Sequence, residues 1–238
     1  DAELAKDARE LLDLVRTEKV SIMQATPSTW RMMVESNWDE RIELKVLCGG
    51  EALSKDLAEA LLTRCTSLWN MYGPTETTIW SAVKQIKNTD SQISIGHPID
   101  NTQIYILDQH LRPVSVGRTG EIYIGGAGLA RAYLNKPELT ANSFVPNPIS
   151  PEISSRIYRS GDLGKFLDNG EIQCFGRVDN QVKIRGYRIE LGAIEEALNE
   201  QDNVKESLVI AREDRPGDQR LVAYLIPDTE ANNLNSSQ

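Results

Sequence analysis

Short apolar segments alternate with amphipathic helical segments through the first 80 residues, and this alternation limits the possible folds more than any other feature. Strand-like segments lie at residues 20–23, 44–48 and 67–73. Between them, apolar residues recur at helical spacing, with Thr26 and Ser54 placed as helix N-caps. Strands separated by helices of this length are typical of crossover units. Residues 1–80 are therefore predicted to form an α/β layer with a parallel sheet.

The pattern changes after about residue 80. Short segments of alternating apolar and polar residues follow one another, and the run Asp168-Asn169-Gly170 is a strong hairpin signal. Residues 81–178 are predicted to be mostly β, as an antiparallel, barrel-like or meander module. The order strand, helix, strand, strand over residues 179–228 predicts a small α+β unit. Residues 229–238 lack apolar periodicity and are expected to be a polar tail or linker.

Charge and composition exclude several classes of protein. The 238 residues include 26 Lys+Arg and 35 Asp+Glu, giving a net charge of −9 without a basic block, so we expect no nucleic-acid partner. No apolar run approaches the roughly 18 residues of a membrane-spanning helix, and the charged N-terminal segment does not resemble a signal peptide. Three scattered cysteines without metal-ligand spacing predict a reducing, cytoplasmic setting and no structural zinc.

Several glycine-containing segments carry more polar residues than a plain fold requires. They are 48–54, 70–78, 119–134, 158–166 and 176–195. Each of them, taken alone, also fits a structural turn or a solvated surface. As a set they point to a nucleotide site, because glycines directly after a parallel strand let the backbone approach a ligand at the carboxyl edge of the sheet.

Individual side chains in these segments suit a nucleotide. Tyr72 offers a ring for stacking, and Thr75 is the first of three threonines whose hydroxyls could contact phosphate oxygens. Glu76 could hold Mg²⁺, which needs only one or two protein carboxylates beside the phosphates. Asp162, in a glycine-containing turn, suits the two hydroxyls of a ribose. The sequence contains no P-loop, so such a site would be assembled without one.

Together and in this order, the segments NMYGPTETT, GEIYIGGAGLARAYLNKPELTANSF, YRSGDL and GRVDNQVKIRGYRIELGAIE resemble the adenylation domain of nonribosomal peptide synthetases, in the adenylate-forming superfamily. The resemblance implies an α/β adenylate-forming fold, with 1–178 as the later part of the large subdomain and 179–228 as part of the C-terminal lid. It implies activation of an amino acid by ATP to an aminoacyl-adenylate. The acyl group would then pass to the phosphopantetheine thiol of a peptidyl carrier domain, in a megasynthase that also holds a condensation domain.

The resemblance also implies roles for single residues. Thr75 would touch the α-phosphate, Glu76 would bind Mg²⁺, and Lys183 would lie in the loop brought to the site for thioester formation. Asp179 matches the hinge of the lid. Asn70 and Tyr72 would recognise and stack on adenine, and Asp162 and Arg177 would bind the ribose. The full set implied to bind ATP or AMP is Gly49, Gly50, Glu51, Asn70, Met71, Tyr72, Gly73, Asp162 and Arg177.

The amino-acid pocket is predicted by position relative to these motifs. The residues expected to line it are Gln24, Val46, Cys48, Met71, Ile79 and Trp80. Trp80 and Met71 would limit its depth, and Gln24 could hydrogen-bond a substrate side chain. Val46, Ile79 and Met71 also fit the sheet core. No charged residue belongs to the set, which leans against a strongly ionic substrate side chain.

Departures from the family pattern predict that these 238 residues alone are not a competent catalyst. The sequence lacks the Ser/Thr/Gly-rich phosphate loop, the Asp that grips the substrate amine and the C-terminal lysine in an Asn-Gly-Lys context. Ala132, where the family usually has glycine, should have only a local effect. Two other readings remain open. One is an acyl- or aryl-CoA ligase of the same superfamily, and the other is a non-catalytic nucleotide-binding relic.

Overall fold

The computed structural model describes residues 7–150, 155–179, 181–184, 186–215 and 218–228. The expected tail at 229–238 lies outside these residues. The chain divides into two compact units, of which the first ends at Val178 and the second begins at Asp179. None of the helices in the described ranges is long and apolar enough to cross a membrane.

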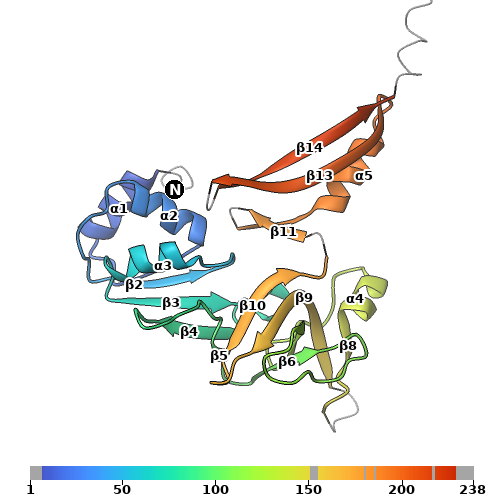
Figure 1. Ribbon diagram of the computed structural model, residues 1–238, viewed down its shortest axis with the longest axis horizontal. Coiled ribbons are helices and arrows are strands. Elements are labelled where there is room, and N and C mark those ends of the chain that lie inside the picture. The colour runs from blue at the N-terminus through green and yellow to red at the C-terminus, as the bar shows by residue number, and fades with distance from the viewer. Residues whose placement is uncertain (1–6, 151–154, 180, 185, 216–217, 229–238) are drawn as a thin grey trace, which may run out of the picture. The chain divides into compact units, whose positions relative to one another are not determined.

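The first half of unit 1 is a five-stranded sheet with helices on one face (Figure 1). The strands β1, β2 and β3 run parallel, as the alternating sequence pattern predicts, and α1, α2 and α3 connect or flank them. The elements of this half are α1 (Ala8–Thr17), β1 (Ile22–Ala25), α2 (Pro27–Glu35), β2 (Lys45–Gly49), α3 (Lys55–Leu62), β3 (Ser67–Tyr72), a 3₁₀ turn η2 (Thr75–Thr77), β4 (Ala82–Ile86) and β5 (His97–Pro98).

The first sheet extends further along the chain than the sequence pattern suggests. β4 pairs antiparallel with β3, and β5 pairs antiparallel with β4, so the change near residue 80 does not separate two sheets. The cause is a tight turn, in which Thr78 and Ile79 both adopt left-handed backbone conformations and send the chain back along β3. The sheet is therefore mixed, and its parallel part is confined to β1, β2 and β3.

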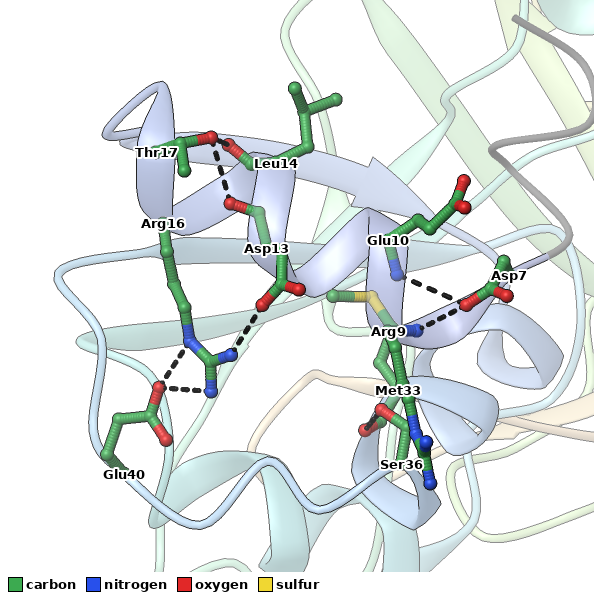
Figure 2. Close-up of polar contacts among 10 residues, drawn as sticks. All are labelled: Asp7, Arg9, Glu10, Asp13, Leu14, Arg16, Thr17, Met33, Ser36 and Glu40. Carbon is green, nitrogen blue, oxygen red and sulfur yellow. Dashed lines mark hydrogen bonds and ion pairs between the residues drawn. The ribbon is translucent and has the colours of Figure 1, made fainter.

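A side-chain cap fixes the start of α1. Asp7 accepts hydrogen bonds from the backbone N–H groups of Arg9 (2.9 Å) and Glu10 (3.1 Å) and so caps α1, as Figure 2 shows. Arg16, at the other end of α1, pairs with Asp13 and with Glu40 in the connection before β2 (Figure 2). These ion pairs are on the surface, and pairs of this kind usually contribute little to stability.

The helix-covered face of the first sheet holds the main core. Trp30 and Trp38 are fully buried there with ring centroids 6.3 Å apart, and the Trp30 indole donates to the Leu47 carbonyl at 3.2 Å. Val46 and Leu68 join them from the sheet. Burial of one such side chain contributes about 1.5–3 kcal/mol, so this core holds the helices on the sheet.

The second half of unit 1 is an antiparallel sheet in the order β10-β9-β7-β6, with β8 paired to β9. The predicted hairpin is confirmed, because Gly170 has a φ of +79° in the turn between β9 and β10. The elements are β6 (Thr102–Leu107), β7 (Gly120–Gly126), α4 (Pro137–Ser143), β8 (Phe144–Pro146), β9 (Arg156–Phe166) and β10 (Ile172–Arg177).

The described residues of unit 2 form two hairpins and one helix. The Gly186 turn (φ +81°) joins β11 to β12, a hairpin that the sequence pattern does not predict, and α5 packs on β13 of the second hairpin. Glu195 of α5 accepts a hydrogen bond from the Val209 amide at 2.8 Å. The elements are β11 (Gln181–Ile184), β12 (Tyr187–Glu190), α5 (Leu191–Asn199), β13 (Val204–Arg215) and β14 (Asp218–Pro227).

Candidate active site

The turn after β3 has a tightly constrained backbone. A Cβ on Gly73 would lie 2.4 Å from the Ile79 carbonyl oxygen and 2.8 Å from the Ser81 nitrogen, so only glycine fits there. Thr78 and Ile79 have φ values of 62° and 70°. This conformation is unusual for β-branched residues and costs about 1–3 kcal/mol each. Strain of this kind is concentrated at functional sites, and this turn carries Thr75 and Glu76.

Hydrogen bonds from distant residues hold this turn in place. The Ala130 amide donates to the Glu76 carbonyl oxygen at 2.8 Å, and the Tyr133 hydroxyl donates to the Glu76 carboxylate at 2.6 Å. Partial burial and the bond to Glu76 raise the pKa of Tyr133, so its hydroxyl stays protonated. Glu76 is buried, whereas Thr75 is exposed at the start of the turn. Tyr133 is not among the predicted site residues, although it lies within a matched segment.

Asp162 is the centre of a second buried polar group. Its carboxylate accepts hydrogen bonds from the Tyr72 hydroxyl (2.6 Å) and from Arg177 (2.5 Å). The Ser160 hydroxyl accepts from the Asp162 amide at 3.0 Å, which fixes the backbone at this position. An ionised carboxylate has about four acceptor positions, so these two bonds leave capacity for a ligand hydroxyl. The structure thus brings three of the predicted nucleotide residues together.

Tyr72 is more buried than a ring that is free to stack on a base. It is 8% exposed and packs in the second core with Ala82 and Ile95. Burial raises the pKa of Tyr72 well above its usual value, and the charge of Asp162 adds to this effect. Its hydroxyl therefore remains a donor to Asp162. The clearest observed role of Tyr72 is to orient that carboxylate, and its stacking on adenine stays a prediction.

Asn70 is held by Ser94, which belongs to a partly buried charged cluster. Its amide nitrogen donates to the Ser94 carbonyl at 2.8 Å, and the Ser94 hydroxyl donates to Glu171 at 2.7 Å. Lys84 pairs with Glu171 at 2.6 Å and with Asp90 at 3.3 Å. Burial alone would raise the pKa of Glu171, but the bonds from Lys84 and Ser94 outweigh it and lower that pKa. The charged cluster thus joins β4 to the start of β10 and fixes the Asn70 side chain.

The predicted glycine turn after β2 is present, but Glu51 has a partner of its own. Gly50 has a φ of +92°, and a Cβ on Gly49 would lie 2.6 Å from both the Met71 carbonyl oxygen and the Trp80 ring. The Glu51 carboxylate accepts bonds from the Ser28 amide (3.1 Å) and hydroxyl (2.6 Å). Its side chain therefore supports the N-terminus of α2, where a negative charge is favourable.

The predicted pocket residues divide between the two faces of the sheet. Cα partners in neighbouring strands share a face, and Gln24 is paired with Leu47, while Gly49 is paired with Met71. Val46 and Cys48 alternate with these residues and point to the helix-covered side, where both are fully buried in the core. Val46 and Cys48 therefore lie on the opposite face of the sheet from Gln24 and Met71, and the role of these residues in an amino-acid pocket stays a prediction. Leu47 and Gly49 lie on the same face as Gln24 and Met71.

The remaining two predicted pocket residues, Ile79 and Trp80, lie in and after the turn that follows β3. The Trp80 ring packs against the backbone at Gly49, as the 2.6 Å clearance to an added Cβ indicates. Ile79 is 59% exposed in the strained turn, so it is not part of the sheet core. The structure thus brings Gly49, Met71 and Trp80 into close contact.

Thiol reactivity tests the place of Cys48 in the core. Burial raises the pKa of Cys48 to about 12, with the charge of Glu51 adding, and burial raises the pKa of Cys65 to about 11. Cys174 is only partly buried. The folded chain should therefore expose one fast thiol to an aromatic disulfide reagent at about pH 8, and the other two should react only on unfolding. Cys174→Ser should remove the fast thiol, and rapid labelling of Cys48 in the folded chain would contradict its place in the core.

The donor set around Glu76 suits Mg²⁺ only in combination with a ligand. The described part of the chain holds no cluster of three or more His, Cys, Asp or Glu side chains that would bind a metal by itself. Mg²⁺ is usually held by one or two carboxylates together with substrate phosphates and water. A buried glutamate with an oriented carboxylate fits that chemistry, so Glu76 is a suitable single protein ligand.

The predicted hinge and lid residues belong to unit 2. Asp179 is its first residue and accepts a hydrogen bond from the Gln181 amide at 3.2 Å. Lys183 lies on β11, paired in register with Arg188 of β12. The hairpin presents Lys183 one residue pair away from its turn.

Comparison with known proteins connects these features to one family. The model of the AMP-binding enzyme family matches residues 1–134, which is more than half of the chain. The dimodular nonribosomal peptide synthase of Bacillus subtilis (strain 168) is 44% identical over 95% of this chain. Tyrocidine synthase 3 of Brevibacillus parabrevis is 43% identical over 93% of it. The chain spans only 10% and 4% of these two relatives.

Solved structures give the same result for the fold. A four-domain nonribosomal peptide synthetase bound to AMP and glycine is 43% identical, with a TM-score of 0.71, over 95% of this chain and 17% of that one. A protein with adenylation and PCP domains, bound to a vinylsulfonamide inhibitor, is 30% identical with a TM-score of 0.86, over 97% and 41%. These similarities confirm the predicted α/β adenylate-forming fold. The chain belongs to the AMP-binding enzyme family.

Proposed function

We propose that this chain is part of the adenylation domain of a nonribosomal peptide synthetase module. In this role it activates an amino acid with ATP to an aminoacyl-adenylate. The acyl group then passes to the phosphopantetheine thiol of a peptidyl carrier domain, beside a condensation domain of the same megasynthase. The single observation that carries the proposal is the buried group of Asp162, Tyr72 and Arg177, which is built from residues 90 and 15 positions apart.

The nucleotide would bind at the carboxyl edge of β2 and β3. Asp162 would accept hydrogen bonds from the ribose hydroxyls, held in place by Tyr72 and Arg177. Asn70, fixed by Ser94, would contact adenine from the end of β3. The backbone around Gly49–Glu51 and Met71–Gly73 would lie beside the base. Open α/β sheets bind ligands at this edge, and close backbone approach requires the glycines found there.

The strained turn would bind the phosphates and their metal ion. Thr75, exposed at its start, would contact the α-phosphate, and Glu76 would hold Mg²⁺. When bound, the metal would offset negative charge on the phosphates. The protein contributes mainly position and fixed electrostatics to such chemistry, which explains why the turn is strained and clamped. The amino acid would lie beside residues of the predicted pocket, among them Gln24, Met71 and Trp80.

Unit 2 would supply the groups for the second half-reaction. Asp179 is proposed as the hinge between the units, since it is the first residue of unit 2. Lys183 is proposed to act in thioester formation. One lid that re-forms a site can serve two reactions in turn, because positioning is the main contribution of the protein.

We expect the 238 residues alone to show no amino-acid-dependent ATP–pyrophosphate exchange. Their sequence contains neither a Ser/Thr/Gly-rich phosphate loop nor a lysine in an Asn-Gly-Lys context. Each lost group that stabilises transition-state charge typically costs about 10²–10³ in rate. The measurement compares this chain with an extended polypeptide, meaning this sequence lengthened at both ends until both elements are present. Only the extended polypeptide is expected to show exchange, and robust exchange by the 238 residues would contradict this prediction.

A further inference from the structure

The turn that carries Glu76 is clamped by a segment about 50 residues away in the sequence. The Thr78 hydroxyl donates to the Gly128 carbonyl at 2.7 Å, and the Ala130 amide donates to the Glu76 carbonyl oxygen at 2.8 Å. A Cβ on Gly128 would lie 2.9 Å from the Thr77 carbonyl oxygen, so the two backbones are in close contact. These contacts fix the backbone of the turn but do not fix the direction of the Glu76 carboxylate.

Tyr133 makes the contact that orients the side chain. Its hydroxyl donates to Oε1 of Glu76 at 2.6 Å. Glu76 is 7% exposed, so little solvent is present to compete for the carboxylate. A short bond to an ionised acceptor is about twice as strong as a bond between neutral groups. The hydroxyl therefore selects one orientation of a side chain that would otherwise have several rotamers.

Tyr133 is itself fixed at both ends. Its backbone amide donates to the Thr140 hydroxyl at 3.0 Å, which ties it to α4. Its ring meets the buried Phe144 edge-on, with centroids 5.6 Å apart, and Phe144 packs against Tyr158 at 5.3 Å. Aromatic pairs of this geometry contribute stabilisation beyond that of their buried area. A continuous set of contacts thus runs from α4 and β9 to the Glu76 carboxylate.

We propose that Tyr133 is a positioning residue that fixes the Glu76 carboxylate for Mg²⁺ beside the phosphates of ATP. This inference rests on the proposed function, because it takes Glu76 to be the metal ligand. Hydrogen-bond partners of metal-binding side chains orient them, and their loss typically lowers metal affinity about 10–100-fold. Tyr133 acts through Glu76 and does not itself touch the metal.

The test measures the affinity of the extended polypeptide for ATP by calorimetry, with excess Mg²⁺ and with a chelator. The ratio of the two affinities is the Mg²⁺ enhancement. In Tyr133→Phe this enhancement should fall about tenfold or more, while the metal-free affinity stays within about twofold. Glu76→Gln should remove the enhancement, and adding Tyr133→Phe to Glu76→Gln should change nothing further, because both changes act through one carboxylate.

Two further variants separate positioning from folding. Tyr123→Phe is the matched control, because Tyr123 also donates to a glutamate, Glu121, at 3.2 Å, and it should leave the enhancement unchanged. Thr140→Val keeps the phenol but loses the acceptor of the Tyr133 amide, so it should lower the enhancement by a smaller factor. An unchanged enhancement in Tyr133→Phe, or an equal loss of both affinities, overturns the inference. Absence of any enhancement in the parent polypeptide overturns the metal role of Glu76, and the inference with it.

Discussion

Replacing Asp162 by alanine is expected to abolish nucleotide binding and to lower the free energy of unfolding of unit 1 by about 3–5 kcal/mol. The side chains of Asp162 and Arg177 are only 10% and 14% exposed. Arg177 would lose the carboxylate that neutralises it in this buried position, and Tyr72 would lose the acceptor of its hydroxyl. Removal of one partner from a buried pair is costly because the other charge stays buried.

Urea unfolding and ATP titration of the extended polypeptide measure the two effects separately. Asp162→Asn keeps the shape and one acceptor oxygen but removes the charge. Its free energy of unfolding and its affinity for ATP should therefore lie between those of the parent and alanine variants. Asp214→Ala is the control, because Asp214 pairs with Arg212 and Arg220 on an exposed hairpin, and neither quantity should change measurably. A stable Asp162→Ala variant with parental affinity for ATP would show that this buried group is not the ribose site.

Glu76→Gln is expected to lower the rate of ATP–pyrophosphate exchange by the extended polypeptide about 10²–10³-fold. The substitution keeps the size of the side chain and an acceptor for Tyr133. It removes the negative charge that would hold Mg²⁺. The effect should be mainly on the maximal rate and on the Mg²⁺ requirement, with a smaller effect on the Michaelis constant for the amino acid.

Glu121→Gln provides the comparison for this prediction. Glu121 also accepts a hydrogen bond from a tyrosine and pairs with Arg159 at 2.9 Å, but it lies on β7 outside the proposed site. The exchange rate of the Glu121→Gln variant should equal that of the parent polypeptide. If Glu76→Gln kept a rate close to that of the parent, Glu76 would not be the metal ligand.

Local sequence patterns predict the parts of the fold that depend on neighbouring residues. Alternating apolar strands and capped helices indicate the parallel part of the first sheet, and the run ending at Gly170 indicates a hairpin that the structure contains. The extension of that sheet by β4 is not predictable in this way. It depends on Thr78 and Ile79 in left-handed conformations, which β-branched residues disfavour.

The site is predictable as a set of residues but not as a geometry. Asp162, Tyr72 and Arg177 are all identifiable in the sequence, yet their contacts join positions up to 90 residues apart. Strand β2 shows how sensitive a strand is to register. Val46 and Cys48 lie on one face of the sheet and Leu47 and Gly49 on the other, and a shift of one residue would exchange the two pairs.

Tyr133 is a site residue that the sequence pattern does not identify. It lies in a segment that matches the family, but no local pattern connects it to Glu76, which is 57 residues earlier. Only the folded chain shows that α4, Phe144 and Tyr133 support the turn.

Amino-acid activation is tested most directly by ATP–pyrophosphate exchange with the extended polypeptide, across a panel of amino acids, aryl acids and fatty acids. If this chain belongs to an adenylation site, exchange should occur with one or a few amino acids and with none of the other acids. Exchange only with aryl or fatty acids would place the chain in an acyl- or aryl-CoA ligase. A folded extended polypeptide that exchanges with no acid would contradict a catalytic role.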